Sequence, residues 1–172
     1  MRRIIVLTGN GKGKTTSAIG SAVRALGRGF KVYFYQFLKS KDAEYGEHLF
    51  FKSNTKRNLI RLGLGCRKDF KYTTKDKKAA TDGLKKIDVE LSRNKKAKTL
   101  CVLDEVSYPM NWKWFTVDDV TDLIKGHPKV NFILTGRDMP KKLISLADTV
   151  SSVEEIKHAY QKGCKAEQGV EF

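Results

Sequence analysis

One glycine-rich stretch followed by a lysine and two threonines has the residue types and spacing to bind phosphate. It reads Thr8-Gly9-Asn10-Gly11-Lys12-Gly13-Lys14-Thr15-Thr16. Glycines adopt backbone angles closed to other residues, so successive N–H groups of such a loop can turn toward an anion. Lys14 would reach the outer phosphates of a nucleotide, and the Thr15 hydroxyl would complete the shell of a magnesium ion. The strict P-loop pattern has glycine at position 8, so the alternative is a glycine-rich turn without a ligand.

Two adjacent carboxylates, Asp104 and Glu105, follow an apolar run at 99–103. One carboxylate can bind or orient magnesium, and the other can position water or substrate. Arg137 follows a third apolar run and is a candidate phosphate or substrate contact. The alternatives are a solvent-exposed acid pair and a surface salt bridge.

Alternating strand and helix patterns place these groups together. Apolar runs predict strands at 4–7, 31–39, 58–62, 99–106, 130–135 and 148–156, and helical patterns cover 17–26, 74–93, 116–125 and 140–147. Between them, 40–56 is expected to be a long loop. This alternation predicts a three-layer α/β domain with a mainly parallel sheet. Because ligands gather at the carboxyl ends of parallel strands, the loop, the acid pair and Arg137 should share one edge.

The composition fits a single domain with anionic partners. The chain has 172 residues and a formal net charge of +15, and residues 39–98 carry 18 Lys or Arg against 8 Asp or Glu. That excess keeps nucleic acid open as a partner, although a solvated surface is the simpler interpretation. Three widely spaced cysteines, Cys66, Cys101 and Cys164, argue against a disulfide framework or a zinc site and favour the cytoplasm. Neither a membrane span nor a signal peptide is expected.

Aromatic and histidine residues add few further signals. The stretch Asn111-Trp112-Lys113-Trp114-Phe115 predicts an aromatic anchor before a helix that Thr116 and Asp119 cap. Since His48 and His127 belong to no motif, we expect both at the surface.

Several stretches spread over nearly the whole chain carry a family resemblance. They are the phosphate loop, Gln36-Phe37-Leu38-Lys39, Leu103-Asp104-Glu105, Thr135-Gly136-Arg137, Leu146-Ala147-Asp148, and Ile156-Lys157-His158 with Lys165-Ala166 and Gly169. Together they resemble the P-loop type of ATP:corrinoid adenosyltransferase. The resemblance implies one P-loop NTPase-like, RecA-like α/β/α domain over 1–172, with the tail at 157–172 packing near the active site.

The resemblance also implies a reaction at carbon. Cobalt reduced to Co(I) attacks C5′ of ATP, and inorganic triphosphate leaves. The implied substrates are ATP and a reduced corrinoid, with Mg²⁺, a cellular reductant such as a flavoprotein, and a homodimeric assembly. Nucleic acid and membrane are not expected partners.

The same resemblance implies roles for individual residues. Catalytic roles fall to Lys14, Glu105 and Arg137, and magnesium binding to Thr15, Glu105 and Asp104. Nucleotide binding falls to Thr8, Gly9, Asn10, Gly11, Lys12, Gly13, Lys14, Thr15, Thr16 and Arg24. For Arg24 the alternative is a solvated helix arginine, and for Lys157 and His158 it is a purely structural role.

One departure from the family concerns the corrinoid. Well-known members carry an aromatic pair after the glycine motif, where this chain has Cys66, Arg67 and Lys68. Either Phe70, Tyr72, Trp112 or Trp114 substitutes, or the protein has another substrate. The competing hypotheses are a P-loop ATPase or nucleic-acid-binding ATPase, and an ATP-binding homologue that has lost corrinoid chemistry.

Overall fold

A parallel β-sheet forms the middle layer of the protein in the computed structural model, which describes residues 2–40, 42, 44–54, 59–65, 72–94 and 98–171. The strands are β1 (Ile4–Thr8), β2 (Lys31–Gln36), β3 (Leu59–Arg61), β4 (Thr99–Asp104), β5 (Val130–Thr135) and β6 (Thr149–Ser152). Their order across the sheet is β3-β2-β4-β5-β1-β6, and each neighbouring pair is parallel. The expected α/β fold is confirmed, and the described sheet is wholly parallel.

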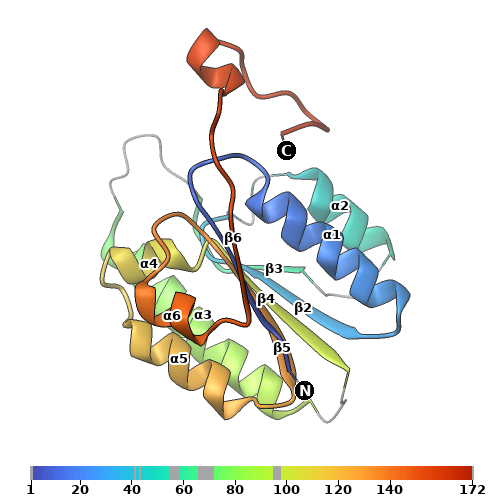
Figure 1. Ribbon diagram of the computed structural model, residues 1–172, viewed down its shortest axis with the longest axis vertical. Helices are drawn as coiled ribbons and strands as arrows, with labels where there is room; N and C mark the ends of the chain where they lie inside the picture. The colour runs from blue at the N-terminus through green and yellow to red at the C-terminus, as the bar shows by residue number, and fades with distance from the viewer. Residues whose placement is uncertain are drawn as a thin grey trace.

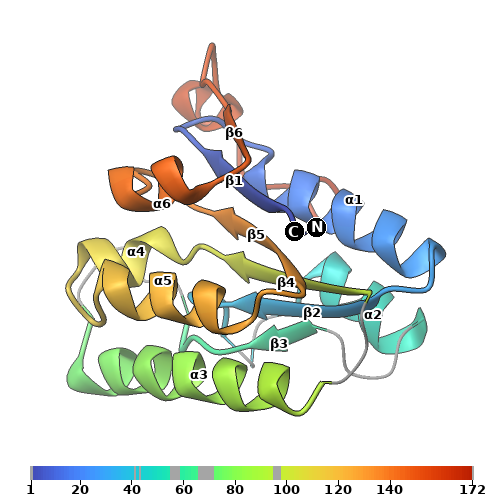
Figure 2. The same cartoon turned by 60° about the horizontal axis from the view of Figure 1, so that its bottom comes forward.

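Helices cover both faces of this sheet (Figures 1 and 2). One face carries α1 (Lys14–Gly27) and α2 (Gly46–Asn54). The other carries α3 (Thr74–Ser92), α4 (Ser107–Asn111), α5 (Val117–Gly126) and α6 (Lys141–Leu146). A short 3-10 helix, η1 (Ala159–Lys162), lies in the segment that leaves the sheet after β6.

Each face of the sheet has its own apolar core. Successive strand side chains point to opposite faces, so Phe34 packs with α1 and α2, whereas Tyr35 packs with α3. Helix α1 contributes the small side chains of Ala18 and Ala22, both fully buried. The strands that support the loops at the sheet edge are therefore fixed from both sides.

The carboxyl ends of the strands bring the chemically active segments to one edge, as expected. There β1 continues into the glycine-rich loop, β4 into Glu105 and β5 into Gly136. Because β5 lies between β1 and β4, the acid pair sits one strand away from the loop.

Two α-helices were not predicted from the sequence. Helix α2 lies within 40–56, which we expected to be a loop. Of its described side chains only Phe51 is fully buried, while Leu49 and Phe50 are 48% and 45% exposed, so these side chains form no buried apolar stripe. Helix α4 has five residues, too few for a helical period to show in the sequence.

The surface position expected for His127 is wrong. Its ring is 9% exposed, and Nε2 lies 2.8 Å from Oδ1 of Asp88.

None of the described helices is both long and apolar enough to cross a membrane. The predictions for Cys66, Arg67, Lys68 and Phe70 fall outside the described residues.

Candidate active site

The glycine-rich loop ends at the N-terminus of α1. Gly13 precedes the helix with φ of 122°, a backbone angle that favours glycine. Its carbonyl accepts a hydrogen bond of 2.8 Å from the Ser17 N–H. The first N–H groups of α1 and the positive end of its dipole thus face the loop, which favours an anion there.

Gly9 and Gly11 are needed for a different reason, which is the close approach of another segment. A Cβ at Gly9 would lie 2.5 Å from the Val153 carbonyl oxygen, and one at Gly11 would lie 2.4 Å from that of Glu154. The Gly11 N–H also donates to the Val153 carbonyl at 2.7 Å. The chain after β6 therefore holds the loop from behind, and this N–H is not directed at a ligand.

Lys14 is the half-buried cation of the loop. Its Nζ donates to the Gly11 carbonyl at 2.7 Å. Burial, and next the charge of Arg137, lower the pKa of Lys14, while Glu105 opposes this shift. Since a cation in this position gains from a neighbouring anion, the loop is electrostatically suited to phosphate.

Asp104, the last residue of β4, is fully buried and joins three strands to the loop. Its Oδ1 accepts hydrogen bonds from Thr15 Oγ1 at 2.9 Å and from Thr135 Oγ1 at 2.6 Å. Its Oδ2 accepts one from Gln36 Nε2 at 3.1 Å. Burial raises the pKa of Asp104, and these three hydrogen bonds limit the rise. The carboxylate is therefore fixed in direction.

Glu105 has a strained backbone. Its φ is 61°, which a non-glycine residue rarely adopts, and its N–H donates to Thr135 Oγ1 at 2.9 Å. Burial, together with the negative charge of Asp104, raises the pKa of Glu105 to about 7. Strain of this kind persists where the surrounding structure imposes it, and Glu105 is one of the residues that line the cavity beside the loop.

Helix α2 reaches the same acid pair through Gln36. The Gln36 amide is fully buried, and its Oε1 lies 2.6 Å from His48 Nε2. Its Nε2 donates to Glu47 Oε1 at 3.3 Å as well as to Asp104. His48 was expected at the surface, but it is half-buried, and burial lowers its pKa to about 4. Among the described side chains, its Nδ1 is a buried nitrogen without a hydrogen-bond partner.

An open cavity of about 270 Å³ lies over these groups. Most of the expected phosphate loop lines it, together with two further candidates, Glu105 and Arg137. The Arg137 guanidinium donates to the Asn10 carbonyl at 3.2 Å. The lining residues are Asn10, Gly11, Lys12, Gly13, Lys14, Thr15, Thr16, Ile19, Lys39, Tyr45, Glu47, Glu105, Tyr108, Thr135, Gly136, Arg137, His158 and Glu171.

The C-terminal tail contributes two of these lining residues. Glu171 Oε1 lies 4.0 Å from Lys12 Nζ, and Figure 1 shows the last part of the chain returning toward α1. His158 also lines the cavity, and its Nδ1 accepts a hydrogen bond from the Tyr160 N–H at 3.2 Å.

Four of the expected site residues do not line the cavity: Thr8, Gly9, Arg24 and Asp104. Arg24 is exposed in the last turn of α1, and Thr8 faces the Met139 N–H at 3.5 Å. Asp104 lies beneath the cavity floor and acts on it through Thr15. Sequence reasoning gave no role to Lys39, Tyr45, Glu47, His48 or Tyr108. The only sequence signal near these residues was the Gln36–Lys39 stretch.

Comparison with known proteins identifies relatives along the whole chain. The family model described as ATP:corrinoid adenosyltransferase BtuR/CobO/CobP matches residues 1–172. A corrinoid adenosyltransferase of Pseudomonas aeruginosa is 34% identical over 174 residues, covering 98% of this chain and 83% of its own. Corrinoid adenosyltransferase CobA of Salmonella typhimurium is 32% identical, and the corrinoid adenosyltransferase of Escherichia coli strain K12 is 31% identical. Both matches cover 98% of this chain and 85% of the relative.

Proposed function

Because this chain belongs to the ATP:corrinoid adenosyltransferase family, we propose that it transfers the 5′-deoxyadenosyl group of ATP to the Co(I) of a reduced corrinoid. A cobalt–carbon bond forms with the electron pair of Co(I), the bond from C5′ to oxygen breaks, and triphosphate leaves with that bond's electrons. Since Co(I) is itself a strong nucleophile, the protein has only to position the substrates and stabilise the leaving group. The observation that carries the proposal is the Thr15–Asp104 hydrogen bond, which unites the phosphate loop and the acid pair.

The cavity groups suit the charge that develops on the triphosphate. Lys12, Lys14 and Arg137 would donate to its oxygens, with the N–H groups at the start of α1. Preorganised donors of this kind stabilise a leaving anion more strongly than they stabilise the bound substrate. Thr8, Gly9 and Arg24 stay predictions as nucleotide contacts, since none of them lines the cavity.

The residues present fit a magnesium ion. Mg²⁺ prefers oxygen ligands and is usually bound through one or two carboxylates together with substrate phosphates. Thr15 and Glu105 offer such oxygens at the cavity, and Asp104 accepts a hydrogen bond from the Thr15 hydroxyl. Among the described residues, no three His, Cys, Asp or Glu side chains could hold a metal ion alone. Bound there with ATP, magnesium would neutralise charge on the triphosphate.

The setting and assembly are further parts of the proposal. Reduction of the corrinoid cobalt to Co(I) needs a supply of electrons, which a flavoprotein in the reducing cytoplasm would provide. The proposed assembly is a homodimer, which light scattering of the purified chain would test.

The decisive experiment is anaerobic incubation of the protein with chemically reduced cobalamin, ATP and Mg²⁺. The expected products are a light-sensitive adenosylated corrinoid, seen in the visible spectrum, and intact triphosphate. The competing P-loop ATPase would instead release ADP and orthophosphate, with or without a polynucleotide. An ATP-binding homologue without corrinoid chemistry would bind ATP and form neither product.

A further inference from the structure

Four aromatic rings form a connected group beside the active-site cavity. We refer to Tyr72, Tyr108, Trp112 and Trp114 as the aromatic cluster. Trp112 is its centre, because its ring centroid lies 4.3 Å from that of Tyr72, 4.9 Å from Trp114 and 5.4 Å from Tyr108. The fourth contact joins Tyr72 and Trp114 at 5.3 Å.

The aromatic cluster is not simply part of the core. Within the described chain, only Trp114 of the four packs against the buried apolar residues, and all four rings stay half-buried. The two indoles are brought together at Lys113, whose φ of 57° is unusual for a residue with a side chain. The backbone N–H of Trp114 donates to the Pro109 carbonyl at 2.8 Å and so fixes this turn. A strained turn thus presents two partly exposed tryptophans side by side.

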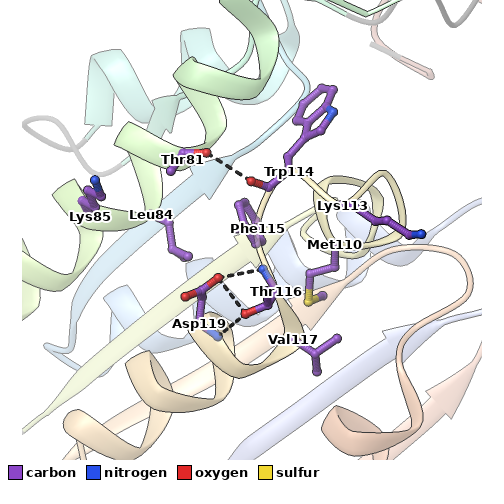
Figure 3. Close-up of a pocket in the computed structure, with 10 residues that line it drawn as sticks. All are labelled: Thr81, Leu84, Lys85, Met110, Lys113, Trp114, Phe115, Thr116, Val117 and Asp119. Atoms are coloured by element: carbon purple, nitrogen blue, oxygen red, sulfur yellow. Dashed lines mark hydrogen bonds between the residues drawn. The ribbon is translucent and has the colours of Figure 1, made fainter. Parts of the chain in front are cut away.

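The aromatic cluster is continuous with the active site. Tyr108 lines the cavity that holds Lys14 and Glu105, and the adjoining ring belongs to Trp112. On the other side, Trp114 borders a second hollow between α3 and α5. Figure 3 shows its indole pointing away from Leu84 and Phe115 of that hollow. The rings therefore lead outward from the cavity where the reacting carbon must lie.

We propose that the flat ring of the corrinoid stacks on the aromatic cluster, with Trp112 as the central contact. This inference rests on the proposed function. A corrin is a broad, conjugated and largely apolar macrocycle, and aromatic faces bind such rings by stacking and apolar burial. Of the other residues that line the cavity, most are polar or charged, which suits triphosphate rather than a macrocycle. The ring and the nucleotide would then meet at Tyr108. Trp112 and Tyr72 are positioning residues for the cobalt and take no part in bond making.

Steady-state kinetics with chemically reduced cobalamin test this assignment. Trp112→Ala should raise KM for the corrinoid about tenfold, as expected for the loss of one stacking contact. The KM for ATP and the ATP dissociation constant measured without corrinoid should stay within about twofold. Trp112→Phe should recover most of the corrinoid affinity, because it keeps an aromatic face. Phe50→Ala is the matched control, since Phe50 is an exposed aromatic residue on α2, outside the cavity lining.

The outcomes separate this inference from the proposed function. If the wild type adenosylates cobalamin and Trp112→Ala has an unchanged KM for it, the stacking surface is wrong and the activity stands. If the KM for ATP rises equally, the residue has a general structural role and the inference also falls. Should Trp112→Ala fail to fold in thermal unfolding, Tyr72→Ala provides the same readout from the rim of the cluster. Wild-type protein without adenosylation would instead overturn the proposed function.

Discussion

The phosphate side of the active site and the aromatic cluster are built in contrasting ways. On the phosphate side, Asp104 is fully buried at the end of a central strand and accepts three hydrogen bonds. In the aromatic cluster, Tyr108 lies on the five-residue helix α4, Trp112 and Trp114 follow that helix, and Tyr72 lies just before α3. The four rings contact one another. Hydrogen-bonded groups in a packed core have one arrangement, whereas stacked rings tolerate several. We infer that triphosphate recognition is strict and that recognition of the corrinoid can vary.

The largest effect should follow from removal of the loop cation. Lys14→Ala should lower kcat for adenosylation roughly 100- to 1,000-fold, the usual loss for one donor to a developing anion. Rapid-quench assays of triphosphate release would measure it. Lys125→Ala is a suitable control, because Lys125 lies in the last turn of α5, away from the cavity. A loss below about fivefold would mean that the phosphate side does not depend on this cation.

The next effect concerns magnesium. Thr15→Ala removes the hydroxyl that joins the loop to Asp104, and it should raise the Mg²⁺ concentration for half-maximal rate about 10- to 100-fold. Thr15→Ser keeps the hydroxyl and should restore a value close to wild type. Magnesium titrations at saturating ATP would distinguish the two variants. Equal curves for both would contradict the magnesium role of the hydroxyl.

A glycine substitution tests how rigidly the loop is held. Gly11→Ala places a Cβ against the Glu154 carbonyl oxygen and should reduce the free energy of unfolding by about 1–3 kcal/mol. Gly27→Ala is the matched control, because a Cβ added at Gly27 would meet no atom of another segment within 4 Å. That variant should gain roughly 0.4–1 kcal/mol. Urea titrations of both variants would show whether the segment after β6 really confines the loop.

The smallest effect is a pH dependence through His48. Burial lowers its pKa from 6.5 to about 4 in the folded protein, so the unfolded chain binds the proton more tightly. Stability should therefore fall as pH decreases from about 6.5 to about 4 and lose nothing more below that range. His48→Gln retains a donor for Gln36 and should flatten this part of the profile. A profile identical to wild type would exclude His48 as its source.

Strong local patterns account for what the sequence predicted correctly. Buried strands such as β4 and β5 read as continuous apolar runs, and α3 reads as an amphipathic helix because its apolar residues recur on one side. Parallel strands then force their loops to one edge, which brought Lys14 and Glu105 together in the prediction.

The missed features depend on contacts between distant residues. Gln36 and His48 act on Asp104 only after β2, β4 and α2 have packed, so no spacing in the sequence reveals them. The same holds for Gly9 and Gly11, whose crowding comes from residues 153 and 154. From the sequence we predicted that these glycines bind phosphate. In the structure, their lack of a side chain also makes room for residues 153 and 154.

The position of β1 has a consequence for how the protein is made. Although β1 precedes the other described strands along the chain, its two neighbours in the sheet are β5 and β6, which begin at Val130 and Thr149. The Gly11 N–H likewise has its hydrogen-bond acceptor only after Val153 has been added to the chain. During synthesis β1 therefore has none of its sheet neighbours until β5 and β6 have been added, and the glycine-rich loop gains the support of the segment after β6 only then.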